Sequence, residues 1–190
     1  MLHDLQGYGA PMREPLGVVL AGGLGTRMGG RKALAVLDGR PLVAHVLDAL
    51  AAVTREQVVV AKRDTALPPD LTVWVEPDEP RHPLAGVRHA LREAGGAPVL
   101  CCGVDLPRLD PATLRALVAG AGPASAVARA GGFLHPTVAL WTPAALPALE
   151  AFTPGEPARA VAVRAGLRAV EVDPAALVNV NRPEDLEALG

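Results

Sequence analysis

A glycine-rich segment with three cations, residues 20–32, has the clearest potential for chemistry in this 190-residue sequence. It reads Leu-Ala-Gly-Gly-Leu-Gly-Thr-Arg-Met-Gly-Gly-Arg-Lys and follows the apolar run 16–20. Glycines let backbone N–H groups approach anionic oxygens without interference from a Cβ atom, and a cation just beyond neutralises the charge. The segment therefore predicts a phosphate-binding loop after a buried strand.

Two common phosphate-binding signatures do not fit this loop. A Walker A motif has Ser or Thr after its lysine, whereas Lys32 is followed by Ala33. The dinucleotide pattern Gly-x-Gly-x-x-Gly fits only if Met28 replaces its last glycine, and a helix would then have to begin inside a glycine-rich turn. The loop still favours nucleotide binding.

Four further motifs follow the loop along the chain. They are Pro-Leu-Ala-Gly at 83–86, Asp-Leu-Pro at 105–107, His-Pro-Thr at 135–137 and Asn-Val-Asn-Arg-Pro-Glu at 179–184. With the loop, they resemble the molybdenum cofactor guanylyltransferases, a family of nucleotidyltransferases. The resemblance spans residues 16–190. It implies transfer of GMP from GTP to the phosphate of Mo-molybdopterin with release of pyrophosphate.

Such a transfer needs cations on the triphosphate, a divalent metal at the reacting phosphate and an acceptor oxygen in line. Lys32 and Arg27 are the candidate catalytic cations, and a solvated surface cation is the alternative for each. Mg²⁺ accepts a single carboxylate together with phosphate oxygens and water. The resemblance makes Asp105 that metal ligand. Capping is the alternative for this aspartate, although Asp110 already precedes Pro111 in a capping position.

Nucleotide contacts are expected on both sides of residue 83. By resemblance Asp78 contacts the nucleotide, although its Asp-Glu-Pro context is equally typical of a turn. Gly86 would let the N-terminus of a helix approach closely. His82 replaces a glycine that is common in the family, and Arg31 replaces an aspartate, so the choice of guanine rests on the resemblance. The expected nucleotide-binding residues are Leu20, Ala21, Gly22, Gly23, Gly25, Lys32, Asp78, Gly86 and Asp105.

The acceptor is expected to bind against residues near the end of the chain. Asn179 and Asn181 are two positions apart in an extended segment, so they face the same side and can bind phosphate or pterin amides. His135 lies in the His-Pro-Thr motif, which the resemblance places in the acceptor half. Turn formation by the asparagines and structural hydrogen bonding by the histidine are the alternatives.

The pattern of apolar residues predicts a single Rossmann-like domain of the α/β class, with three α/β/α layers and a mostly parallel central sheet. Half the residues are apolar but only five are aromatic, so Ala, Val and Leu fill the core. Strands are predicted at 16–20, 57–61, 71–75, 98–102, 125–129, 137–141 and 169–172, with a short extended piece at 33–37. Helices are predicted from 41, at 83–94, from 111, from 143, at 158–165 and at 183–189. Functional residues belong at the carboxyl ends of the strands.

Residues 1–15 are predicted to form a flexible tail, and 16–190 the nucleotidyltransferase domain. Its nucleotide-binding half covers about 16–110 and its acceptor-binding half about 111–190. A net charge of −2 disfavours a general nucleic-acid surface. The first 15 residues hold no apolar stretch that suits a signal peptide or membrane span, so we expect a cytoplasmic protein.

The resemblance implies Mg²⁺ as the cofactor and GTP and Mo-molybdopterin as substrates, and it leaves room for molybdenum-cofactor delivery or acceptor proteins as partners. A related cytidylyl- or sugar-phosphate nucleotidyltransferase is the nearest alternative. A non-catalytic nucleotide-binding module is the alternative from another class. A dinucleotide-dependent oxidoreductase is disfavoured by the missing last glycine of its motif.

Overall fold

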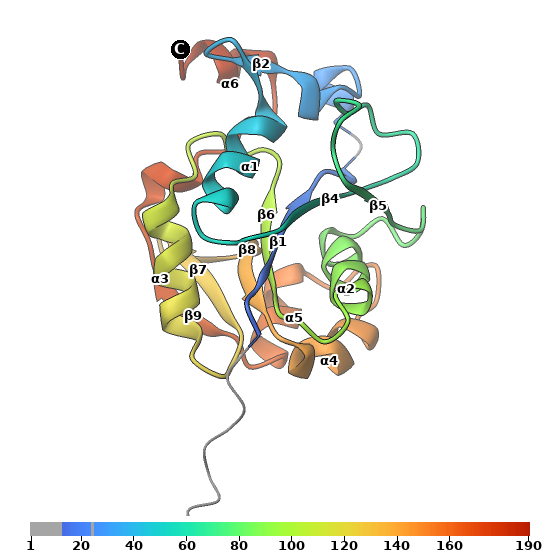
Figure 1. Ribbon diagram of the computed structural model, residues 1–190, viewed down its shortest axis with the longest axis vertical. Coiled ribbons are helices and arrows are strands. Elements are labelled where there is room, and N and C mark those ends of the chain that lie inside the picture. The colour runs from blue at the N-terminus through green and yellow to red at the C-terminus, as the bar shows by residue number, and fades with distance from the viewer. Residues whose placement is uncertain (1–12, 24) are drawn as a thin grey trace, which may run out of the picture.

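A computed structural model describes residues 13–23 and 25–190 of the chain. Most of the predicted tail at 1–15 therefore lies outside the described residues. The central feature is a seven-stranded sheet in the order β5-β4-β1-β6-β8-β7-β9, with a layer of helices on each face (Figure 1). The predicted three-layer α/β/α arrangement is confirmed.

The sheet is mostly parallel, as predicted. β1 pairs in parallel with β4 on one side and β6 on the other, and β8 alone runs antiparallel to both of its neighbours among the described strands. Continuous apolar runs form the central strands because both faces of the sheet are covered by helices. The strands are β1 (Leu16–Leu20), β4 (Gln57–Ala61), β5 (Val73–Val75), β6 (Val99–Gly103), β7 (Ala126–Ala130), β8 (Phe133–Trp141) and β9 (Arg168–Glu171).

The helices divide between the two faces of the sheet. α1 (Leu42–Ala51) and α3 (Pro111–Ala121) pack on one face, and α2 (Pro83–Glu93), α4 (Leu146–Glu150) and α5 (Ala158–Arg164) pack on the other. Each layer has its own apolar core because leucine and valine recur at helical spacing. Short 3₁₀ helices are η1 (Thr26–Met28), η2 (Lys32–Leu34), η3 (Pro143–Ala145) and η4 (Pro174–Leu177).

The order of the strands creates a switch point beside β1. The chain leaves β1 to form β4 and β5 on one side and then returns to form β6 on the other. Open parallel sheets bind ligands at the carboxyl ends of the strands at such a point. β8 begins at this same edge because it runs antiparallel to β6.

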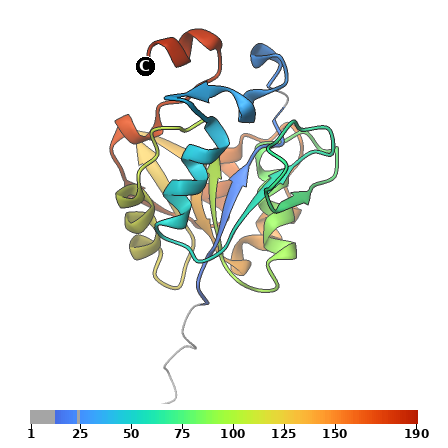
Figure 2. The ribbon, with the colours of Figure 1, turned by 45° about the horizontal axis from the view of Figure 1, so that its top comes forward.

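Two segments from opposite ends of the chain lie beside each other at the carboxyl edge of the sheet. A two-stranded hairpin of β2 (Val36–Leu37) and β3 (Arg40–Pro41) lies beside α6 (Pro183–Glu187), which comes from the end of the chain (Figure 2). Val180 is fully buried in the small apolar cluster that joins them. The C-terminal segment thereby returns to the glycine-rich loop.

Three local expectations differ from the structure. α1 begins one residue after Pro41, because Pro41 pairs with Val36 in the hairpin. Residues 33–34 belong to a 3₁₀ helix, so the predicted extended piece at 33–37 is short. β8 begins at 133, because consecutive glycines with positive φ form a tight turn before it. Pro136 therefore lies in a strand. It falls at an irregularity in the register with β7, where a residue without a backbone N–H removes no hydrogen bond from the sheet.

Among the described residues, no helix combines the length and apolar character that a membrane-spanning segment requires.

Candidate active site

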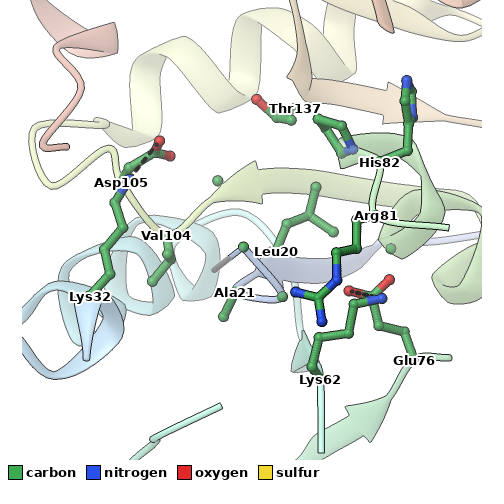
Figure 3. A pocket seen from close by; sticks show the side chains of 15 residues that line it. Leu20, Ala21, Lys32, Lys62, Glu76, Arg81, His82, Val104, Asp105 and Thr137 are labelled. Carbon is green, nitrogen blue, oxygen red and sulfur yellow. Dashed lines mark hydrogen bonds and ion pairs between the residues drawn. The ribbon is translucent and has the colours of Figure 1, made fainter. Parts of the chain in front are cut away.

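A cavity of about 360 Å³ opens at the carboxyl ends of β1, β4 and β6 (Figure 3). Residues 20–23, Lys32, Gly86 and Asp105 line it, so most of the expected nucleotide-binding residues meet there. Lys32 and Asp105 lie at one end, and Lys62 and Glu76 lie at the other. Leu20 and Ala21 form the floor between the two charged ends (Figure 3).

Some of the predicted site residues lie elsewhere. Gly25 and Asn181 line a smaller neighbouring pocket of about 220 Å³ that shares Lys32 with the main cavity. Asp78 and Asn179 are exposed, and neither they nor the half-buried His135 line these two pockets. The backbone of Arg27 forms part of η1, whereas its side chain falls outside the described part of the structure.

The loop after β1 requires glycine for two different reasons. Gly25, Gly29 and Gly30 have φ values of 53°, 63° and 75°, in the left-handed region that other residues avoid. Gly22 has no space for a side chain, because a Cβ atom there would overlap Glu76 Oε1. The first group bends the loop back toward Lys32, and Gly22 lets the backbone lie against the buried carboxylate.

Lys32 and Asp105 make a direct ion pair at one end of the cavity. Lys32 Nζ lies 3.2 Å from Asp105 Oδ2 and donates a hydrogen bond of 2.7 Å to Asn181 Oδ1. The backbone N–H of Val180 also donates to the carbonyl of Asp105. The glycine-rich loop, the end of β6 and the C-terminal segment therefore converge on one ammonium group.

The pair of Lys62 and Glu76 was missed by the sequence analysis. Lys62 Nζ lies 3.5 Å from Glu76 Oε1 and donates to the carbonyl of Pro77, and both side chains are less than a tenth exposed. Glu76 Oε2 is buried and has no hydrogen-bond partner among the described residues. Burial raises the pKa of Glu76, and the positive charge of Lys62 partly offsets that rise. Buried polar atoms usually have a hydrogen-bond partner, so an unpartnered carboxylate oxygen beside the cavity calls for a functional explanation.

One signal in the sequence could have identified this pair. Lys62 directly follows β4 and Glu76 directly follows β5, and these strands are parallel neighbours. The carboxyl-edge rule that predicted Asp105 therefore applies equally to them. Asp78 lies two residues beyond Glu76, where the chain has already left the edge of the cavity.

Three more residues of the lining were not expected. His82 caps α2, since its Nδ1 accepts from the Leu84 N–H, and its Nε2 donates to the carbonyl of Glu156. Thr137 of the His-Pro-Thr motif lines the cavity in place of His135. Arg81 lines it near Lys62 and Glu76 (Figure 3).

Asp105 could hold a divalent ion only if a phosphorylated ligand supplied further oxygen ligands. The described residues contain no group of three or more His, Cys, Asp or Glu side chains that could hold a metal. Mg²⁺ is commonly bound by one or two carboxylates with substrate phosphates and water. Asp105 fits that pattern as a lone carboxylate at one end of the cavity.

The doubly wound sheet, the glycine-rich loop and the acid–base ends of the cavity define a nucleotide-binding α/β domain of the nucleotidyltransferase class. Residues 17–172 match the family model of the MobA-like NTP transferase domain, and the chain belongs to this family. A divalent metal is consistent with that family.

A molybdenum cofactor guanylyltransferase of Cereibacter sphaeroides is 42% identical over 184 residues, covering 90% of this chain and 92% of the relative. Solved structures share the fold. Molybdopterin-guanine dinucleotide biosynthesis protein A of Archaeoglobus fulgidus has a TM-score of 0.72 at 21% identity, covering 91% of this chain and 95% of the other. Rv0371c of Mycobacterium tuberculosis H37Rv, in complex with manganese, has a TM-score of 0.69 at 22% identity, covering 93% and 98%.

Proposed function

We propose that this protein is a molybdenum cofactor guanylyltransferase, which transfers GMP from GTP to the terminal phosphate of Mo-molybdopterin. The observation that carries the proposal is the meeting of Lys32 and Asp105, 73 residues apart, at one end of a cavity whose other end is a buried ion pair. A nucleotide has the matching polarity, with phosphates at one end and a base at the other. The name of the Cereibacter sphaeroides relative supports the same reaction.

At the phosphate end, an oxygen of the acceptor phosphate attacks the α-phosphorus of GTP, and the bond from that phosphorus to the bridging oxygen breaks. Pyrophosphate leaves with both electrons of that bond, so negative charge grows on it. We propose that Lys32 and the N–H groups of the glycine-rich loop, which line the two pockets, stabilise that charge. Mg²⁺, held by Asp105, would supply Lewis-acid stabilisation of the phosphate oxygens.

At the base end, Glu76 and Lys62 suit guanine. The Watson–Crick edge of guanine presents two donors, N1–H and the N2 amine, beside one acceptor, O6. Glu76 lines the cavity and its carboxylate can accept from these donors, and Lys62 is the neighbouring donor for O6. Cytosine would present its own acceptors, N3 and O2, toward the carboxylate. The pair therefore favours GTP over CTP.

We propose that two parts of the chain bind the two substrates. Residues 16–110 hold the nucleotide, and 111–190 hold the acceptor, with His135, Asn179 and Asn181 on the acceptor side. Asn181 supports this assignment, since the small pocket that it lines adjoins Lys32. Arg27 remains a proposed catalytic cation, Asp78 a proposed nucleotide contact and the cytoplasm the proposed location.

The experiment that tests this function measures pyrophosphate release by the purified protein with Mg²⁺, Mo-molybdopterin and either GTP or CTP. We expect release with GTP, little with CTP, and almost none for Asp105→Asn with either nucleotide. Release only with CTP, or only with a sugar phosphate as acceptor, would show a related nucleotidyltransferase instead. Tight GTP binding without turnover would show a binding module.

A further inference from the structure

The ammonium of Lys32 is fixed by two partners from distant parts of the chain. Its Nζ lies 3.2 Å from Asp105 Oδ2 and 2.7 Å from Asn181 Oδ1. The Lys32 side chain is 18% exposed and that of Asp105 is 27% exposed, so solvent screens the pair only in part. An ammonium has three N–H donors, and these contacts use two of them.

Asn181 is itself held in place by its neighbours. Its backbone N–H donates to Asp185 Oδ2 at 2.7 Å, and the next N–H, of Arg182, donates to the same oxygen. On the other side, Val180 is fully buried and its N–H donates to the carbonyl of Asp105. The amide oxygen of Asn181 therefore accepts the Lys32 hydrogen bond from a fixed position and holds the ammonium beside Asp105.

We propose that Lys32 is the resident counter-cation of Asp105, positioned by Asn181, and that the site therefore takes its divalent ion together with the nucleotide. The inference rests on the proposed function, because it assumes that the ligand is a nucleoside triphosphate. The phosphate oxygens of this ligand would become the new partners of the Lys32 ammonium. It adds a positioning role for Asn181 and the joint binding of the ion and the nucleotide.

The charges in the site explain why the ion and the nucleotide bind together. A divalent ion that arrives alone meets a carboxylate already neutralised by Lys32, and the ammonium repels it. Asp105 alone also leaves most positions around such an ion to water. A triphosphate removes both obstacles, because its oxygens bind the ammonium and also complete the coordination of the ion. Nucleotide and ion therefore bind cooperatively.

The test is titration of the full-length protein with Mn²⁺ in the absence of nucleotide, with free Mn²⁺ measured by electron paramagnetic resonance. We expect wild-type protein to bind free Mn²⁺ weakly. Lys32→Met removes the charge while keeping most of the side-chain volume, and we expect it to raise the affinity at least ~tenfold, within the usual range of coupling between sites. The double variant Lys32→Met with Asp105→Asn should lose that gain.

Two further variants separate position from net charge. Asn181→Leu keeps Lys32 but removes the hydrogen-bond acceptor that positions it. We expect a rise in Mn²⁺ affinity smaller than that of Lys32→Met. Arg55→Met removes one positive charge from an exposed residue just before β4, at the opposite edge of the sheet. It should leave the Mn²⁺ affinity unchanged. Asn181 is exposed, so its variant carries the test even if Lys32→Met fails to fold.

Mn²⁺ affinity that is unchanged in a folded Lys32→Met protein would overturn the proposal. An unchanged affinity in Asn181→Leu would overturn the positioning role of Asn181. These titrations contain neither nucleotide nor acceptor, so their failure leaves pyrophosphate release intact. Failure of the proposed function would instead abolish that release and leave the Mn²⁺ response of the variants in place.

Discussion

Asp105 folds back over Gly103, the last residue of β6, so closely that a Cβ atom on Gly103 would overlap Asp105 Oδ1. The same Cβ atom would lie 3.8 Å from Thr137 Oγ1, on the neighbouring strand β8. Glycine at 103 thus sets the position of the carboxylate that faces Lys32. A positioning role of this kind can be separated experimentally from a role in stability.

Gly103→Ala is expected to lower kcat/KM for GMP transfer by about 100-fold, the scale of loss for a displacement of roughly 1 Å at a reacting centre. The melting temperature should change little, because only a carboxylate has to move. Gly155→Ala is the matched control, since a Cβ atom there meets open space. Steady-state kinetics and thermal unfolding check both variants, and normal kinetics for Gly103→Ala would contradict the expected displacement.

Glu76→Gln is expected to reduce discrimination between GTP and ITP. Inosine lacks the N2 amine of guanine, from which the carboxylate would accept a hydrogen bond. Loss of a paired hydrogen bond in a buried site costs about 1–3 kcal/mol, or roughly fivefold to 150-fold in kcat/KM for GTP. Glu79→Gln is the control, since this neighbouring carboxylate is exposed. Equal GTP-to-ITP ratios in the wild type and Glu76→Gln would remove Glu76 from base recognition.

The raised pKa of Glu76 predicts a pH dependence of stability. Burial makes this carboxyl harder to ionise in the folded protein than in the unfolded chain, whose ordinary pKa is 4.5. Its contribution to the free energy of unfolding is therefore fully present below pH 4.5 and is lost as the pH rises through the folded-state pKa. Urea unfolding across this range should show the loss in wild-type protein and a flatter profile in Glu76→Gln. Identical profiles would contradict it.

Asp110→Ala is expected to lower the free energy of unfolding by about 1 kcal/mol, the usual loss for a helix cap. Asp110 accepts hydrogen bonds from both the backbone N–H and the hydroxyl of Thr113 at the start of α3. Burial raises the pKa of Asp110, but these hydrogen bonds outweigh burial and lower it below 3.8. The stabilisation should therefore fade as the pH falls through that lowered pKa, which chemical denaturation of both proteins measures. Asp70→Ala, at an exposed aspartate, is the control, and an equal loss there would contradict a capping role.

Sequence reasoning predicted the strands and the residues of the Lys32–Asp105 end of the cavity because their signals are local. The apolar run of β1 and the glycines that follow it need no tertiary information, and Asp105 follows directly from the end of a strand. His135 lies in β8, outside the predicted strand at 137–141, because the apolar pattern does not reveal that the chain turns as early as Gly131 and Gly132. In the segment after β5, the family resemblance pointed to the exposed Asp78, whereas the residue that lines the cavity is the buried Glu76.

The most direct test of GMP transfer follows the two labelled ends of GTP in one reaction with Mg²⁺ and Mo-molybdopterin. If the phosphate end and the base end of the cavity hold one nucleotide, label from the α-phosphate will appear in a pterin guanine dinucleotide and label from the γ-phosphate in pyrophosphate. Label from the α-phosphate that stays in GTP or GMP, with no labelled pterin product from active, folded protein, would contradict the account.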